Sequence, residues 1–226
     1  MATIYANTQD GYVARVNQST WSNARANSSG TTASATSPGF FQGIGGFAQS
    51  GRGGGSVYTI YRSFMPFDTS GISANVDSAT LKIRGLSQSG GDVIAVKASS
   101  NISTLTTADF EEIEGWDSSG TNGSGGGDME SSVTKYSNEI TTWSTSGYND
   151  ITLNAQALAD MKNNDNLYIA LINFDYDLKD VAPTDATGRN GLYYANNTGT
   201  SLDPYIDYDL AAVTTADNAI FFGTNF

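Results

Sequence analysis

A short acidic segment holds the densest group of potential catalytic side chains. Asp109, Glu111, Glu112 and Glu114 precede Trp116. A glycoside hydrolase needs two carboxyl groups set across a sugar cleft, whereas acids this close in sequence favour a solvated turn or face. The chain contains no histidine and no cysteine, which excludes Ser-His-Asp and Cys-His catalysis and His- or Cys-ligated zinc. The sequence therefore predicts a protein that is not an enzyme.

Two further polar groups offer oxygen atoms of the kind that calcium prefers. Asp175, Asp177 and Asp180 form one group, and Asn163–Asn166 form the other. Neither has the Asp-x-Asp-x-Asp-Gly spacing of a dedicated calcium loop. Acidic turns that bound strands explain both groups, so we expect no cofactor, and calcium is the one metal that these residues suit.

Aromatic side chains are a third group with a potential binding role, because exposed rings can stack on the apolar faces of sugars. Packing within and between strands accounts for most such residues, and a sugar-binding platform is the alternative. The residues considered for it are Trp21, Trp116, Trp143, Tyr148, Tyr193 and Tyr194.

The elements that carry these residues read as short β-strands. Only 15% of the 226 residues are charged, and Gly, Ser, Thr and Asn are abundant, as in chains rich in strands and turns. Residues 79–84 alternate apolar and polar side chains, which predicts a strand with one buried face. Val57–Phe67 is apolar on both parities and Leu167–Asn173 lacks a polar face, so both are expected to be central strands.

Two segments are expected to depart from this pattern. Asn154 can cap a short helix that runs through Lys162, with Leu158 and Met161 on its buried face. The Gly- and Phe-rich stretch Gly39–Gly55 is expected to be an irregular loop pinned by its aromatic rings.

Arg62 stands out within the long apolar strand. It shares parity with Ile60 and Phe64, so its guanidinium should point into the protein. A buried guanidinium needs a carboxylate or carbonyl partner. The nearby Asp68 is the first candidate, and the sequence predicts a structural ion pair between Arg62 and Asp68.

This part of the chain resembles a known family. Residues 62–72 read R-S-F-M-P-F-D-T-S-G-I, and residues 78–83 read S-A-T-L-K-I. They are similar to the core of DNRLRE-type β-sandwich domains, which are disaggregatase-related and resemble carbohydrate-binding modules. Residues 108–116 and 203–208 extend the resemblance, so that it spans Tyr5 to Tyr208. It implies a β-sandwich of the kind found in secreted polysaccharide-active proteins and in phage virion proteins.

Charge and hydropathy restrict the partners. The net charge of −12 opposes binding to nucleic acid and suits a soluble protein or contact with a basic partner surface. No apolar run approaches the ~20 residues of a membrane span. The opening residues, 1–10, have neither the charged nor the apolar region of a signal peptide, which favours a virion protein over an exported polysaccharide-binding protein.

The last sixteen residues, 211–226, follow the predicted sandwich domain, residues 1–210. They carry large apolar side chains whose exposure to water would favour aggregation. One reading is a last strand folded onto its own sandwich; the other is an arm that inserts into a neighbouring subunit. The residues expected to bind a partner are Ile220, Phe221, Phe222 and Phe226.

Together these features predict an all-β, jelly-roll-like antiparallel β-sandwich with one short helix and a C-terminal extension. The expected function is that of a non-enzymatic structural protein of a phage virion, a capsid decoration or cement protein or a tail-associated subunit, acting by protein–protein adhesion. Expected partners are other virion proteins, such as major capsid or tail subunits, or further copies forming a homo-oligomer. The alternative is a carbohydrate-binding module that takes a glycan, either free or displayed on the particle.

Overall fold

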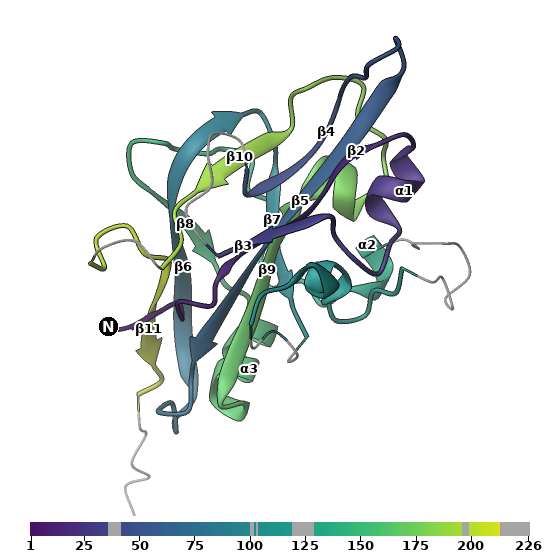
Figure 1. Cartoon of the computed structure of the whole chain (residues 1–226). Helices are drawn as coiled ribbons and strands as arrows, with labels where there is room; N and C mark the ends of the chain where they lie inside the picture. Colours follow the sequence, from purple (N-terminus) through teal and green to yellow (C-terminus); the bar gives the residue numbers. More distant parts are fainter. Residues whose placement is uncertain (36–41, 100–101, 103, 119–128, 196–198, 213–226) are drawn as a thin grey trace, which may run out of the picture.

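A computed structural model describes the chain except for residues 36–41, 100–101, 103, 119–128, 196–198 and 213–226 (Figure 1). Eleven β-strands dominate the described residues, and all pairings between these strands are antiparallel. The strands are β1 (Ala2–Tyr5), β2 (Gly11–Gln18), β3 (Thr32–Ser34), β4 (Ile44–Ser50), β5 (Ser56–Asp68), β6 (Val76–Ser89), β7 (Val93–Lys97), β8 (Tyr148–Thr152), β9 (Asn166–Asn173), β10 (Arg189–Leu192) and β11 (Tyr205–Leu210).

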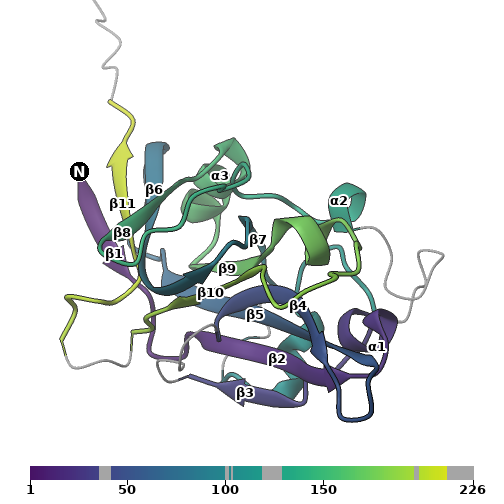
Figure 2. The same ribbon diagram turned by 90° about the horizontal axis from the view of Figure 1, so that it is seen from above.

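The strands form two facing sheets. Sheet A contains β1, β11, the first half of β6, and β8. Sheet B contains the end of β6, then β10, β4, β5, β2 and β3, with β9 and β7 beside the second half of β5. Figure 2 shows sheet A at one side of the molecule and sheet B across its middle. The fourteen-residue strand β6 belongs to both sheets and joins them.

The main hydrophobic core lies between the two sheets. The apolar face of β6, with Ala79, Leu81 and Ile83, meets Met65 and Leu171 and their neighbours from sheet B. The opposite face of β6, with Lys82 and Arg84, is partly exposed. The alternation of residues 79–84 thus predicted the buried face correctly, and the expected all-β sandwich is confirmed.

Sheet B is covered on its second face as well. Ile60 and Phe64 of β5 and Ala170 and Ile172 of β9 pack in a second hydrophobic cluster, which short helical segments and loops cover. Among those segments are α1 (Trp21–Arg25), η1 (Thr107–Glu111), α2 (Met129–Ser132) and η2 (Phe174–Leu178). Because both faces are buried, β5 and β9 carry apolar side chains on both parities, as predicted for central strands.

The predicted helix forms, but it is not the only one. Helix α3 (Ala155–Asn163) begins after Asn154, whose side-chain oxygen accepts hydrogen bonds from the backbone N–H groups of Gln156 and Ala157. Met161 of α3 is fully buried in the main core. Four further helical segments, α1, α2, η1 and η2, accompany α3. The sequence did not reveal them, because each has only four or five residues. That length is too short to display a helical hydrophobic period.

The expected irregular loop contains a strand instead. β4 occupies Ile44–Ser50 and lies between β5 and β10. A Cβ added at Gly45 would stand 2.7 Å from the Cβ of Arg189, and one at Gly46 would stand 3.0 Å from that of Tyr176. These glycines allow close packing against β4 rather than marking a loop.

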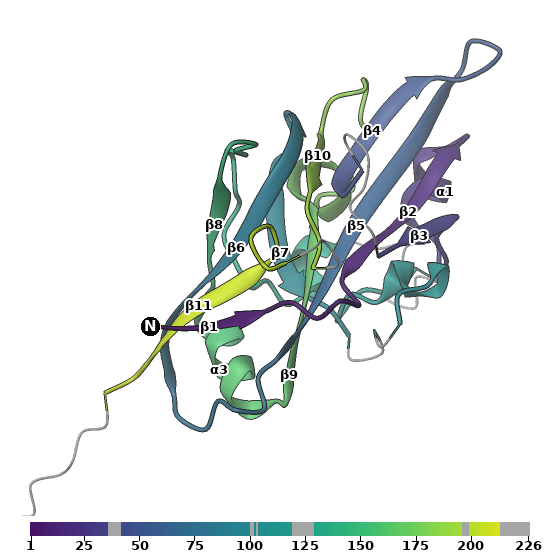
Figure 3. The same ribbon diagram turned by 60° about the vertical axis from the view of Figure 1, so that its left-hand side comes forward.

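The two ends of the described sandwich lie together. β1 pairs with β11, and the N-terminal ammonium is 2.7 Å from a carboxylate oxygen of Asp209 (Figure 3). β11 is flanked by β1 on one side and by β6 on the other, so both of its edges are paired. The residues predicted to bind a partner, Ile220, Phe221, Phe222 and Phe226, lie outside the described residues.

Candidate functional site

Arg62 is fully buried, as predicted, but its partner is not Asp68. Its Nε and Nη2 donate to the two carboxylate oxygens of Asp177 at 2.7 and 2.8 Å, and its Nη1 donates to the carbonyl oxygen of Phe110 at 2.7 Å. Asp177 is also fully buried. The predicted Arg62–Asp68 ion pair is therefore wrong. Six residues of extended strand separate the two by about 20 Å, beyond the reach of an arginine.

Asp68 instead stabilises the turn after β5. Its carboxylate accepts hydrogen bonds from the backbone N–H of Ser70 at 3.0 Å and from the Ser70 hydroxyl at 2.6 Å. These bonds favour the ionised form, so the pKa of Asp68 is lowered. The residue is exposed and has a local structural role.

A second buried arginine completes the network around Asp177. Arg25 donates from Nε to the Asp177 carbonyl oxygen at 2.7 Å, and this nitrogen is 3.5 Å from a carboxylate oxygen of the same residue. The guanidinium carbon of Arg62 lies 4.3 Å from the centre of the Trp116 ring, and that of Arg25 lies 5.8 Å from it. The cluster joins β5, α1 and η2, so its role is to fix the layer that covers sheet B.

The acidic segment before Trp116 does not present paired carboxyl groups across a cleft. Asp109 completes the capping box at the start of η1 by accepting from the backbone N–H of Thr106, and Glu112 accepts from the Ser99 hydroxyl. Glu111 accepts from the Ser118 hydroxyl, and Glu114 forms an ion pair with Lys97. Each acid has its own local partner, as expected for structured turns.

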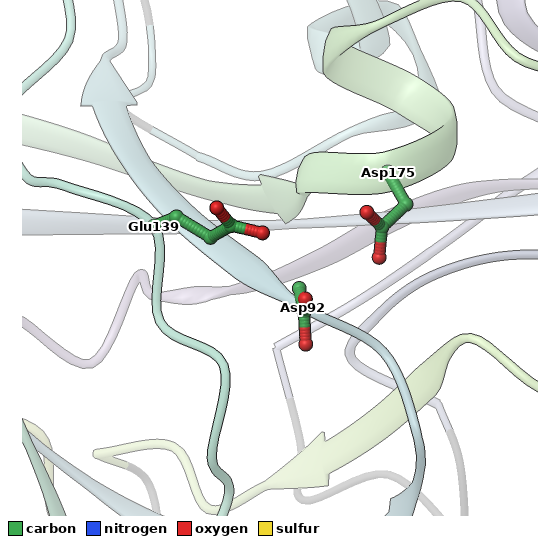
Figure 4. Close-up of side chains that lie close together, drawn as sticks. All are labelled: Asp92, Glu139 and Asp175. Carbon is green, nitrogen blue, oxygen red and sulfur yellow. The ribbon is translucent and has the colours of Figure 1, made fainter.

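The predicted calcium residues are separated by the fold. Asp177 and Asp180 interact with the buried arginines, and Asp180 also accepts from the Trp21 indole N–H. Asp175 instead faces Asp92 and Glu139, and carboxylate oxygens of these three residues lie within 4.8 Å of one another (Figure 4). Partial desolvation and then hydrogen bonding to Asp92 raise the pKa of Glu139. These oxygens suit calcium in type, but three carboxylates are few for an ion that takes six to eight ligands.

Half of the six aromatic residues considered for sugar binding are core residues, and Trp21, Tyr148 and Tyr193 are partly exposed. Trp116, Trp143 and Tyr194 are buried, and Trp21 packs against the second cluster. Tyr148 is the one that joins an exposed aromatic group.

That group, the tyrosine cluster, consists of Tyr5, Tyr148 and Tyr205 on the outer face of sheet A. The ring centres of Tyr5 and Tyr205 are 5.6 Å apart, and those of Tyr148 and Tyr205 are 5.0 Å apart. Tyr5 pairs with Tyr205 across β1 and β11, and it is 45% exposed. The interplanar angles of 48° and 68° make the surface curved rather than flat. Polar residues such as Lys82 and Asp207 flank it.

A polar cleft, here called the Lys97 cleft, lies where the end of β7 meets the start of β9. Its volume is about 420 Å³, within the range of ligand sites. The residues that line it are Lys97, Ala98, Ser99, Glu114, Tyr136, Asn164, Asp165, Asn166 and Tyr168. The sequence indicated residues 163–166 only as oxygen ligands, and it could not place residues 97–99, Glu114 and Tyr136, which come from distant segments, beside them.

Two ion pairs and one buried hydrogen bond hold Lys97 in the cleft. The Lys97 ammonium is 3.0 Å from a Glu114 oxygen and 3.3 Å from an oxygen of Asp160. The same Asp160 oxygen accepts from the Tyr136 hydroxyl at 2.6 Å. Burial lowers the pKa of Lys97, but hydrogen bonds to Glu114 and Asp160 outweigh it, so the net pKa is raised. The lysine thus stays charged and is neutralised by its two partners.

Two other lining residues of the cleft, Asp165 and Asn166, offer side-chain acceptors that no described residue uses. The side chains of Asp165 and Asn166 are exposed, and neither has a hydrogen-bond partner within the described chain. Because Lys97 is matched by two carboxylates, Asp165 leaves the cleft with an excess of negative charge. Chemically, the cleft suits a donor-rich or cationic group and disfavours an anion.

Comparisons with known proteins leave the family open: no protein-family model matches the chain, and no significant match appears among curated proteins. The resemblance to DNRLRE-type domains therefore rests on the quoted residues. Within the part of the chain that the structure describes, no helix has the length and apolarity to cross a membrane.

Proposed function

We propose that this protein is a non-enzymatic structural protein of a phage virion, a capsid decoration or cement protein or a tail-associated subunit, that acts by adhesion. The main support is the position of β11. Both edges of β11 are paired, with β1 and with β6, so the segment that follows cannot add a strand beside β11 itself. The residues that follow β11 in the sequence include Ile220, Phe221, Phe222 and Phe226, whose large apolar side chains are of the kind that anchor a protein to a partner.

The size of these side chains makes an anchoring role reasonable. Together they could bury about 400 Å², which at ~25 cal/mol/Å² corresponds to roughly 10 kcal/mol before ordering costs. Ordering a terminal segment removes most of this, and a few kcal/mol would remain. The resemblance of residues 62–83 to a family that includes phage virion proteins points the same way.

Truncation after Leu210 tests the proposal. We expect the shortened protein to keep its melting temperature within a few degrees, because the strands on both sides of β11 are retained. We expect it to lose co-sedimentation with purified virions in which mass spectrometry detects the full-length chain. A matched control replaces the four apolar residues with serine at full length. Unfolding on truncation, or unchanged co-sedimentation, would contradict the anchoring role.

A carbohydrate-binding module is the second candidate, and the tyrosine cluster favours it. If it binds glycan, Tyr205→Ala should abolish glycan-array binding, because the Tyr205 ring contacts both other rings of the cluster. Melting temperature should change little, since the ring lies on the outer face. Tyr58→Ala, which alters a ring that contacts Trp21 elsewhere, serves as the control. A wild-type protein that binds no glycan above background would remove this candidate.

A further inference from the structure

We propose that copies of this chain associate head to tail, with Arg52 of one copy entering the Lys97 cleft of the next. This inference deepens the adhesion proposal, on which it rests, by naming a partner and a contact. The Lys97 cleft is rich in acceptors and negatively charged, and Arg52 is an exposed cation elsewhere on the same molecule.

Arg52 lies at the tip of the β4–β5 hairpin, which projects beyond the rest of the sandwich (Figures 1 and 3). The residue is exposed and has no ion-pair or hydrogen-bond partner in the described chain. Its neighbours in the turn are Gly51, Gly53, Gly54 and Gly55. A Cβ added at any of the last three would meet nothing within 4 Å. The tip is therefore narrow, with the guanidinium as its only charged group.

The hairpin tip and the cleft lie at opposite ends of β5. β5 begins at Ser56, beside the turn, and ends at Asp68, which pairs with Asn166 of the cleft. Thirteen extended residues span about 40 Å. Arg52 therefore cannot reach the cleft of its own chain, and the contact has to form between two copies.

The chemistry of the two partners is complementary. A guanidinium has five N–H donors and no acceptor. The cleft offers the unpaired carboxylate of Asp165, the amide of Asn166 and the second oxygen of Glu114, with the ring of Tyr168 beside them. Carboxylates bind guanidinium groups in charge-assisted pairs, and an aromatic face adds cation–π attraction. A cleft of about 420 Å³ has room for an arginine side chain and the glycine turn that carries it.

The geometry also determines the type of assembly. The contact joins two different surfaces of identical chains, so it is heterologous, and repetition gives a ring or an open filament. Such an array suits a subunit that decorates a regular particle.

Charge exchange tests the contact in the full-length protein. Sedimentation velocity at physiological salt, which screens the repulsion between copies of net charge −12, should show concentration-dependent association of the wild type. We expect Arg52→Asp and Asp165→Arg each to weaken association by about tenfold or more. The double variant, which restores the pair with its charges exchanged, should regain most of it. Lys162→Asp, a charge reversal at an exposed position on α3, is the control and should associate as the wild type does.

Each other result would overturn the inference. A wild-type protein that stays monomeric at every concentration tested would do so, as would association that survives both single reversals. Failure of the double variant to recover, with all variants folded by circular dichroism, would also count against the pair. Specific binding of a neutral oligosaccharide that Asp165→Arg abolishes would assign the cleft to sugar instead. None of these results depends on the residues after Leu210, so the truncation experiment remains a separate test of virion attachment.

Discussion

Replacing Asp177 with asparagine is expected to lower the free energy of unfolding by about 3–5 kcal/mol. Asp177 is the carboxylate that two buried guanidinium groups share. An asparagine of the same shape can accept one hydrogen bond but carries no charge, so Arg62 would remain buried without a counter-ion. Urea unfolding at pH 7 measures the change as a shift in the midpoint at unchanged slope.

Arg62→Met should cost less, on the order of 3 kcal/mol, because Arg25 still lies beside the stranded carboxylate. The double variant Arg62→Met/Asp177→Leu should be more stable than the sum of the single losses predicts, since it leaves no unpaired charge in this pair. The matched control is the exposed pair of Lys82 and Asp150, where Lys82→Met should cost under about 1 kcal/mol. A loss below about 1 kcal/mol for Asp177→Asn would show that the network does not hold the covering layer in place.

In the Arg62–Asp177 network, the burial of the arginine could be predicted from the sequence but its partner could not. The burial of Arg62 follows from its parity with Ile60 and Phe64, and the structure confirms it. Its partner could not be found in this way, because Asp177 is 115 residues further along the chain and only the tertiary fold brings it close. The rise of an extended strand alone, however, would have excluded Asp68.

The alternation of apolar and polar residues predicted those strands whose faces are evenly buried or exposed. It failed for β4, where glycines make room for side chains from other parts of the chain. Residues 79–84 and β9 were predicted correctly, because hydrophobic patterning depends on which faces are covered. β4 was missed, since glycines at positions 45 and 46 read as a loop unless Arg189 and Tyr176 are known to pack against them.

The tyrosine cluster and the Lys97 cleft could not be predicted from the sequence, because both depend on how distant segments pair in the fold. Tyr5 and Tyr205 are 200 positions apart and meet only because β1 pairs with β11. The Lys97 cleft likewise combines segments from four parts of the chain. Local composition identified Tyr148 and residues 163–166, but it could not indicate which partners the fold would place beside them.

Asp10 is expected to make the stability of the protein fall as the pH rises from acid to alkaline. The residue is fully buried, and both carboxylate oxygens face the backbone N–H of Ala195, at 3.0 and 2.9 Å. Desolvation raises its pKa from 3.8 to about 8, against the lowering effect of that hydrogen bond and with a further increase from the charge of Asp203. Tyr194, whose own pKa is raised by burial, also interacts with Asp10 and with Tyr12.

The direction of the effect follows from these two pKa values. Below pH 3.8 both the folded and the unfolded chain hold the proton, and the contribution of Asp10 is fully present. Between pH 3.8 and about 8 the unfolded chain has released the proton while the folded chain keeps it, so folding becomes less favourable by about 1.4 kcal/mol per pH unit. Above pH 8 both states are ionised, and the contribution stays at its minimum.

Asp10→Asn separates this effect from other titrating groups. The asparagine carbonyl can still accept from Ala195 and carries no charge, so the variant should lack this part of the pH dependence. We expect the difference in unfolding free energy, variant minus wild type, to grow by on the order of 4 kcal/mol between pH 5 and pH 8. Asp68→Asn is the control, because that exposed carboxyl group has a lowered pKa and titrates below this range. Parallel curves for wild type and Asp10→Asn across the range would mean that Asp10 is ionised in the folded protein at neutral pH.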